Sequence, residues 1–311
     1  MPDILAFDTS NYTTSTALFR DRKIYQQKHL LPVKKGELGL RQSDAVFHHV
    51  QQLPDLLEEL LRQTPLQDLK AVGCSTRPRT QPGSYMPCFT VGHGAARQTA
   101  ACFGVPLHTF SHQQGHIAAA LWSAGRLDLF ERPFLAFHVS GGTTEAVLTQ
   151  PGTEEPFTVT LLAQSLDLKG GQAVDRVGRM LGLPFPAGPE LEKLAAQSQV
   201  QFRIHPSMKG ADCSLSGIEN KCLKMQSDGR PAADTAKYCL CSLLAALDAM
   251  AAALLKEHPG LPLVFAGGVM ANQFIRKALT EKYGACFAEP AFSADNAAGV
   301  AVLTACREGL L

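Results

Sequence analysis

The chain has 311 residues, 45% hydrophobic and 18% charged, which fits one large or two medium domains and excludes wholesale disorder. Its formal net charge of +1 excludes a global basic field for nucleic acid, so any such contact must be local. Its nine cysteines include no CxxC pair, which argues against a zinc ribbon or a disulfide framework and favours reduced thiols.

The N-terminal half is predicted to begin with a meander of strands. We expect a strand at 4–7, a hydroxyl-rich turn at 8–10, a second β-prone run and a third strand around 23–29. After these we expect a helix over 47–63, a buried strand at 69–76 and a helix over 89–103. The acidic N-terminus does not resemble a signal peptide. We expect a soluble, cytoplasmic protein.

The second half repeats this pattern. We expect a strand, a turn and a second strand over 133–150, then one helix after the glycine turn at 170–171 and another over 184–197. A long helix should follow over 232–257, then a strand and a helix on either side of the Gly-Gly turn at 267–268, and a last helix near 293–309. The apolar run near residue 250 contains Asp248 and is expected to fall short of a membrane span. The repetition predicts an α/β protein of two related domains that face a cleft, with a boundary near residues 111 and 112.

Four turns rich in glycine or hydroxyl groups follow predicted strands or open predicted helices. They are Asp8–Ser10, Ser140–Thr144, Gly170–Gly171 and Gly267–Gly268. Any one could be an ordinary tight turn, but four of them favour a nucleotide cleft, because backbone N–H groups in such turns can bind phosphates. None has the P-loop ending or the Rossmann glycine spacing.

Two histidines, His112 and His116, are four residues apart in "SHQQGHIAAAL". On a helix they share one face and can bind one metal ion, although such pairs more often have no metal. A zinc protease would carry glutamate at position 113 as its general base, and Gln113 cannot take a proton, so proteolysis is disfavoured. Asp295, at the start of the last helix, is either a helix cap or a third ligand.

Asp175 lies one turn into the helix that follows the glycine turn at 170–171. A carboxylate there can bind ribose hydroxyls. The alternative is a solvated acid paired with Arg179 at i+4.

These stretches, in order, resemble one family. They are "FDTS", "SHQQGHIAAAL", "HVSGGTTEAVL", "GQAVDRVGRMLGLPFPAGP", "DCSLSGIENK", "VFAGGVMANQFIR" and "ADNAAG". Together they are similar to the tRNA threonylcarbamoyltransferases, bacterial TsaD and its archaeal and eukaryotic Kae-type relatives. The resemblance implies the actin/Hsp70/sugar-kinase (ASKHA) fold, with lobes 1–111 plus 294–311 and 112–293. It also implies transfer of threonylcarbamoyl from threonylcarbamoyl-AMP to N6 of the tRNA adenosine next to the anticodon.

The resemblance also implies the ligands of the site. His112, His116 and Asp295 match ligands of one divalent metal, iron or zinc, with His138 a candidate fourth. No residue is expected as nucleophile or base. The residues expected around threonylcarbamoyl-AMP, ATP or AMP are Thr9, Ser10, His138, Val139, Ser140, Gly141, Gly142, Thr143, Gly171, Asp175, Gly188, Gly267, Gly268 and Asn272.

The chain departs from the family pattern near the expected reacting centre. The acids that usually follow Ser10 are Tyr12 and Thr13 here, Thr143 replaces a usual His or Asn, and Glu219 replaces a lysine. These changes indicate a divergent member or paralogue. They leave open a carbamoyltransferase with a small-molecule acceptor, or a non-catalytic partner of a true member, although a pure scaffold would need neither histidine.

Partners follow from the resemblance and from local charge. Bacterial relatives act with a TsaB-type paralogue and an ATPase. A tRNA contact would need local basic residues, for which the candidates are Lys169, Arg176, Arg179, Arg203 and Lys209, although a solvated face is the simpler interpretation. No membrane partner is expected.

Overall fold

The computed structural model describes residues 1–32, 40–153, 155–293 and 296–311. The chain forms two compact units, each described separately below. Unit 1 comprises Met1–Leu127, Gly152–Phe157 and Ala294–Leu311, and unit 2 comprises Asp128–Pro151 and Thr158–Ser293.

Unit 1 is built on a five-stranded sheet in the order β3-β2-β1-β4-β5. Its strands are β1 (Pro2–Thr9), β2 (Thr13–Arg20), β3 (Lys23–Leu30), β4 (Asp68–Arg77) and β5 (Leu107–Ser111). β1, β2 and β3 form an antiparallel meander, whereas β4 runs parallel to β1 and β5 parallel to β4. The carboxyl ends of β1, β4 and β5 therefore meet at one edge of the sheet.

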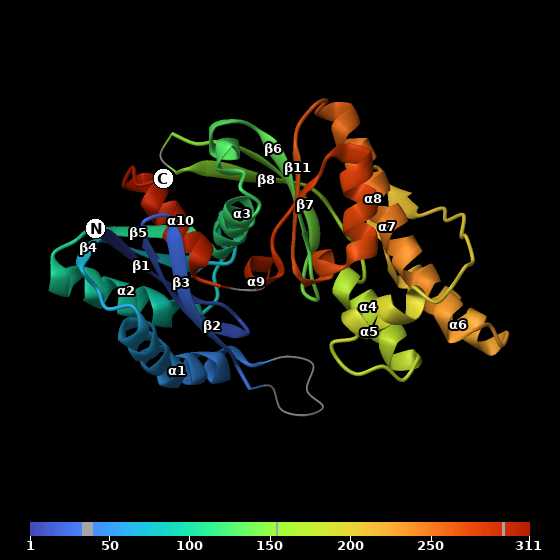
Figure 1. The fold of residues 1–311 in the computed structure, drawn as a ribbon, viewed down its shortest axis with the longest axis horizontal. Coiled ribbons are helices and arrows are strands. Elements are labelled where there is room, and N and C mark those ends of the chain that lie inside the picture. The colour runs from blue at the N-terminus through green and yellow to red at the C-terminus, as the bar shows by residue number, and fades with distance from the viewer. Residues whose placement is uncertain (33–39, 154, 294–295) are drawn as a thin grey trace. The chain divides into compact units, whose positions relative to one another are not determined.

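Helices cover both faces of this sheet, which explains why every residue of β2 is buried. They are α1 (Gln42–Gln63), α2 (Phe89–Phe103), α3 (His112–Ser123) and α10 (Ala298–Arg307). In Figure 1, α1 and α2 lie on one side of the sheet and α3 and α10 on the other. The core under α1 and α2 is apolar, with Phe7, Leu18 and Val72 from the strands and Leu53 and Leu60 from α1.

Unit 2 repeats the same topology. Its strands are β6 (Phe134–Val139), β7 (Thr144–Pro151), β8 (Phe157–Gln164), β11 (Leu263–Ala266) and β12 (Cys286–Phe287), in the order β12-β11-β6-β7-β8. Read from β8, this is the strand order of the first sheet, with β6 in the place of β1. β7 is antiparallel to β6, and β11 and β12 are parallel to it. The predicted duplication and the α/β class are confirmed.

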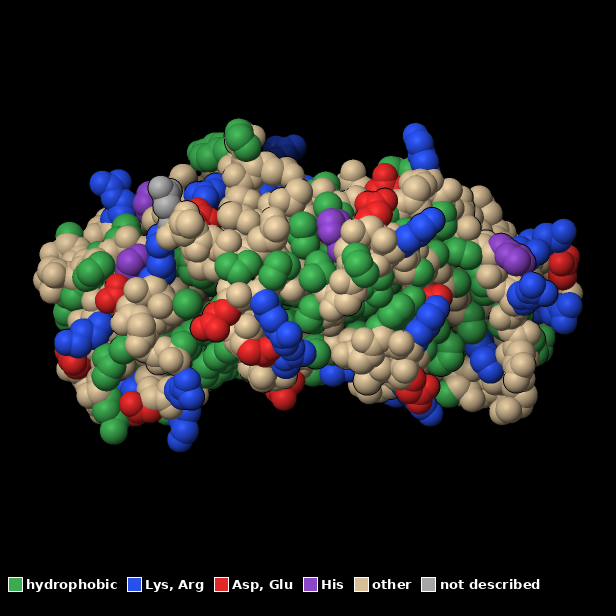
Figure 2. Space-filling view, turned by 90° about the horizontal axis from the view of Figure 1, so that it is seen from above, with side chains coloured by type: hydrophobic (Ala, Val, Ile, Leu, Met, Phe, Trp, Pro, Cys, Tyr) green, Lys and Arg blue, Asp and Glu red, His purple; other side chains and the backbone are tan. Residues whose placement is uncertain are grey.

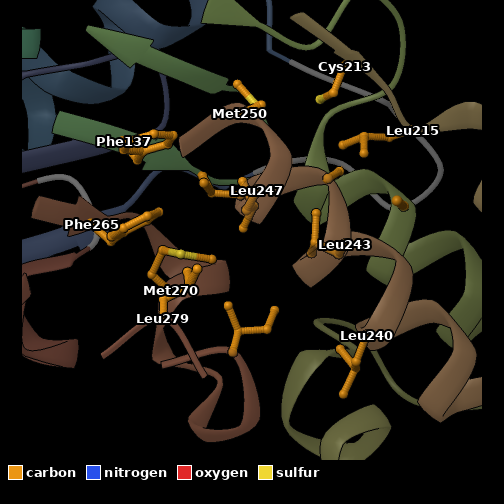
Figure 3. Packing of buried hydrophobic residues seen from close by; sticks show 14 of the residues in the cluster. Phe137, Cys213, Leu215, Leu240, Leu243, Leu247, Met250, Phe265, Met270 and Leu279 are labelled. Carbon is orange, nitrogen blue, oxygen red and sulfur yellow. The ribbon is translucent and has the colours of Figure 1, made fainter. Parts of the chain in front are cut away.

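One helix, α7, forms the centre of the unit 2 core. The helices of this unit are α4 (Gly170–Met180), α5 (Gly188–Ala195), α6 (Ser216–Ser227), α7 (Ala232–Glu257), α8 (Gln273–Tyr283) and the short α9 (Pro290–Ser293). The remaining elements are the 3-10 helices η1 (Leu127–Glu131) and η2 (Gly268–Ala271) and the hairpin β9 (Ser207–Lys209) and β10 (Asp212–Ser214). Figure 3 shows Leu247 and Met250 of α7 toward Phe137 of β6 and Phe265 of β11, with Leu243 farther along the same helix.

α7 differs from what we expected at the sequence level. It has 26 residues, and an 18-residue stretch of it has a mean hydropathy of 1.9, so by length and composition it is a candidate membrane span among the described residues. Eleven of its residues are buried in the unit. The core helix of a soluble protein can have the same length and composition, and half of this apolar stretch is buried inside the unit.

The units divide at a different place from the predicted boundary at residues 111 and 112. That boundary assigned α3 to the second lobe, whereas α3 lies in unit 1 and the chain crosses at Leu127 and Asp128. The reason is a contact between two helix backbones. A Cβ atom added at Gly299 of α10 would overlap the carbonyl oxygen of Gly115 of α3, so the two helices pack as closely as glycine allows.

Candidate functional site

The carboxyl end of β1 places a buried acid beside the first histidine. Asp8 has no exposed surface, and its Oδ1 lies 3.0 Å from Nδ1 of His112. The same oxygen accepts a short hydrogen bond from Oγ of Ser75 on β4. Strands β1 and β4 and the start of helix α3, which are far apart in the sequence, thus bring Asp8, Ser75 and His112 together.

Both histidines lie in the first two turns of α3. Ser111 caps the helix and forms a reciprocal capping box with Gln114, which fixes the helix start at His112. Nε2 of His112 and Nε2 of His116 are 2.9 Å apart, and the ring centroids are 4.4 Å apart. The two histidine rings therefore lie side by side on one face of α3, as the sequence predicted.

The other proposed metal ligands are not tested by this geometry. Asp295 lies outside the described residues, and His138 belongs to β6 of unit 2. Among the described residues, no group of three or more His, Cys, Asp or Glu side chains is arranged to hold a metal ion. The proposed set of metal ligands therefore stays a prediction.

The turn after β1 uses its side chains to hold unit 1 together. Thr9 Oγ1 donates to the carbonyl oxygen of Cys88 at 2.9 Å and accepts from Gly92 N–H at 3.0 Å. Ser10 is buried and donates to the carbonyl oxygen of Thr13 at 3.4 Å. The Thr9 hydroxyl therefore anchors α2 to β1, and its expected contact with a nucleotide stays untested.

His49 of α1 also holds the turn that follows β1. Its side chain is fully buried. Nε2 lies 2.8 Å from the carbonyl oxygen of Ser10, and Nδ1 lies 2.7 Å from Oγ1 of Thr14. Because a carbonyl oxygen only accepts hydrogen bonds, Nε2 carries a proton and donates it to Ser10. Burial lowers the pKa of His49, and the hydrogen bond to Ser10 and the charge of Asp8 oppose this effect.

This burial predicts a pH-dependent stability. As the pH falls below about 6.5, unfolded chains bind a proton at residue 49 more readily than folded ones, so folding loses free energy. We expect wild type to be more stable than His49→Gln by about 1–2 kcal/mol near neutral pH. This difference in the free energy of unfolding between wild type and His49→Gln should become smaller as the pH falls toward about 5. Urea unfolding at several pH values measures this, with His48→Gln as control. A difference in the free energy of unfolding that stays constant with pH would contradict this prediction.

Unit 2 gathers three of the predicted glycine turns at the carboxyl ends of β6 and β11. Gly171 N–H donates to the carbonyl oxygen of Ser140 at 3.0 Å, and a Cβ at Gly171 would lie 2.6 Å from Gly141 N. Gly267 has a φ of 102°, and a Cβ there would overlap the carbonyl oxygen of Val139. Glycine is thus required where these turns meet.

The outer part of the 140–143 turn is open. Ser140 Oγ accepts from the N–H groups of Gly142 at 3.3 Å and Thr143 at 3.1 Å. Gly141 and Gly142 are exposed, and a Cβ added at either would meet nothing within 4 Å. Packing within the described chain therefore does not explain these two glycines.

Asp175 bridges α4 and the segment before α5. Its Oδ1 accepts from Ala187 N–H at 2.8 Å, next to Gly188, the first residue of α5. Burial raises the pKa of Asp175, and the hydrogen bond from Ala187 partly offsets this. No ion pair joins it to Arg179 in the described part of unit 2, so that alternative is not supported.

Asn272, a predicted nucleotide contact, and Glu219, a departure from the family pattern, both have contacts within the protein. Asn272 Oδ1 caps α8 by accepting from Ile275 N–H at 3.0 Å. Glu219, which stands where the family has lysine, lies 2.9 Å from Arg176. The substitution therefore pairs one of the basic residues that were candidates for a tRNA contact.

From the sequence, Asp8 was named only as part of the Asp8–Ser10 turn, and Ser75 and His49 were not singled out. A polar residue directly after an apolar strand, as at Asp8, is the only local signal for them. Ser75 and His49 reach the same place through strand pairing and helix packing, which the sequence does not display.

Comparison with known proteins agrees with this arrangement. Residues 24–302 match the tRNA N6-adenosine threonylcarbamoyltransferase family, TsaD. The chain is 31% identical over 307 residues to the enzyme of that name from Thermus thermophilus, covering 96% of this chain and 91% of the relative. It is 30% identical over 294 residues to that from Streptococcus equi subsp. equi, covering 90% and 83%.

Solved structures share the fold at low identity. HypF from T. kodakarensis aligns with a TM-score of 0.60 and 13% identity over 99% of this chain and 48% of that one. The activator of 2-hydroxyisocaproyl-CoA dehydratase from Clostridium difficile aligns with a TM-score of 0.51 and 13% identity over 99% and 96%. The duplicated sheets are thus of the ASKHA type, and by sequence the chain is a transferase that belongs to the TsaD family.

Proposed function

We propose that this protein transfers a threonylcarbamoyl group from threonylcarbamoyl-AMP to N6 of the tRNA adenosine next to the anticodon. The observation that carries the proposal is the family match over residues 24–302. The paired Nε2 atoms of His112 and His116 and the glycine turns of unit 2 support it. We place the reaction in the cytoplasm.

The nucleotide part of the donor would bind the turns of unit 2. The exposed Gly141 and Gly142 let a phosphate approach the backbone closely, and the N-terminus of α4 favours negative charge. Asp175, held through Ala187, would accept hydrogen bonds from ribose hydroxyls. The backbone N–H groups of the turn and the N-terminus of α4 would stabilise the phosphate as it leaves.

The histidines of unit 1 fit a divalent metal. The two Nε2 atoms are 2.9 Å apart, so one divalent ion could contact both, and imidazole nitrogen is a ligand that suits iron and zinc. Iron or zinc would be held by His112, His116 and Asp295, and His138 is only a candidate for a further ligand. When bound, such an ion polarises a carbonyl as a Lewis acid.

The reaction needs orientation more than a protein nucleophile. The mixed carbamate–phosphate anhydride is already activated, so the protein must hold it against the adenine N6 amine and exclude water. The thiols near the end of β1 are unsuited to attack. Burial, and then the charge of Asp8, raise the pKa of Cys74 and of Cys88 to about 12, so both stay protonated.

The tRNA would contact local basic groups. On the face shown in Figure 2, Lys and Arg side chains are spread out with Asp and Glu side chains between them. Arg176 is paired with Glu219, which leaves Lys169, Arg179, Arg203 and Lys209 as the proposed contacts. Because these are few, we propose that a TsaB-type paralogue and an ATPase assist binding.

Complementation tests the proposal directly. The gene is expressed in cells depleted of their own transferase, alone and together with its own TsaB-type paralogue and ATPase. Nucleosides from purified tRNA are then measured by mass spectrometry. We expect threonylcarbamoyl-adenosine to return. If soluble protein accumulates and the nucleoside stays absent in both cases, the acceptor is not tRNA, and carbamoyl-adenylate donors should then be tested with small alcohols.

A further inference from the structure

We infer that Asp8 is the positioning residue of the His112 metal ligand. It holds the ring with Nδ1 protonated and Nε2 facing His116. This inference rests on the metal part of the proposed function. It concerns a residue that is not itself among the proposed ligands.

The hydrogen bond fixes which nitrogen of His112 carries the proton. An ionised carboxylate only accepts hydrogen bonds, so Nδ1 of His112, 3.0 Å from Asp8 Oδ1, must be the donor. In the neutral ring, Nε2 then carries the lone pair that a metal requires. Ligating histidines commonly donate their other N–H to a carboxylate in this way, and the carboxylate also raises their basicity.

Asp8 is itself held so that it cannot turn away. β1 is a central strand of its sheet, and Asp8 pairs with Ser15 of β2. The carbonyl oxygen of Asp8 accepts from Ser15 Oγ at 3.0 Å, and Oδ1 accepts from Ser75 Oγ. A rigid partner transmits its orientation to the ring, and only 18% of the His112 side chain is exposed.

The environment of the second carboxylate oxygen of Asp8 indicates that this residue does more than stabilise the fold. Oδ2 is buried and has no hydrogen-bond partner among the described residues. A buried carboxylate with an unsatisfied oxygen costs free energy. A cation held through His112 would offset that cost. The alternative is that Asp8 forms an ordinary ion pair with a protonated His112 and has no influence on metal.

The chain contains a matched pair for comparison. His108 Nε2 lies 2.6 Å from Glu308 Oε1, which is another histidine–carboxylate contact in unit 1. Glu308→Gln therefore makes the same chemical change as Asp8→Asn beside a histidine outside the proposed site. Ser75→Ala is a milder test, because it removes only the hydroxyl that holds Asp8.

The experiment titrates the purified full chain with Co²⁺ and follows heat and visible absorption. We expect wild type to bind one Co²⁺, and Asp8→Asn to bind it about 10- to 100-fold more weakly with an altered spectrum. Ser75→Ala should be weakened by a smaller factor, and Glu308→Gln should match wild type. If Asp8→Asn fails to fold, Ser75→Ala decides the question.

The outcomes separate this inference from the proposal beneath it. If His112→Ala loses Co²⁺ while Asp8→Asn or Ser75→Ala keeps wild-type affinity, the positioning role is wrong. If wild type binds no Co²⁺, both the positioning role and the metal assignment are wrong. If tRNA is not modified although Asp8→Asn weakens Co²⁺ as expected, the transfer proposal fails and the role of Asp8 stands.

Discussion

Replacing His112 or His116 with alanine should remove the bound metal and lower the transfer rate by about 10³-fold or more, since a Lewis acid contributes several kcal/mol to such a step. The two rings meet at their Nε2 atoms, 2.9 Å apart, so losing either leaves unit 1 with only one of its two proposed nitrogen ligands. Metal content by mass spectrometry and the rate of nucleoside formation on tRNA measure the effect.

The control for this experiment is His108→Ala. His108 lies on β5 of the same unit and contacts Glu308, so its loss tests for general damage. We expect wild-type metal content and rate. Stoichiometric metal in His112→Ala would show that these histidines do not hold it.

Gly299→Ala should destabilise unit 1 by about 3 kcal/mol, the upper end of the usual cost of overpacking. The added methyl group would overlap the carbonyl oxygen of Gly115 and also crowd Ala119 N. Both obstacles are backbone atoms of α3, so relief requires moving a helix. Because α3 carries the two histidines, metal affinity should fall as well. Urea unfolding and metal titration measure the two effects.

Gly94→Ala provides the matched comparison. Gly94 lies inside α2 of the same unit, and a Cβ there would meet nothing within 4 Å. Alanine in a helix interior is favoured over glycine by roughly 0.5–1 kcal/mol, so this variant should be slightly more stable than wild type. Equal stability of Gly299→Ala and wild type would mean that α3 and α10 are not packed as described.

The fold follows from local patterns to a large degree. β1 and β6 are short apolar runs that end in polar turns, and each is followed by β-prone residues, so the duplicated meander is visible in the sequence. The assignment of α3 to a unit is not visible. It depends on Gly115 and Gly299, which are far apart in the chain and show no periodicity that would link them.

The candidate site was predictable only where its geometry is local. His112 and His116 share a helix face, so their spacing was enough to bring them together. Asp8 and Ser75 meet His112 through the register of a parallel sheet, which no local pattern encodes. Thr9 and Asn272 illustrate the reverse problem, because residues chosen as nucleotide contacts also anchor and cap the helices around them.

The contact between Gly115 and Gly299 also bears on how the protein is made. The strands of the first sheet emerge early from the ribosome and can pair at once, but α10 emerges only after all of unit 2. Until then the face of α3 that receives α10 has no cover. Closing so long a loop is slow and costs chain entropy. The histidine pair should therefore be among the last parts of unit 1 to become ordered, and nascent chains that stall within unit 2 should lack a finished site.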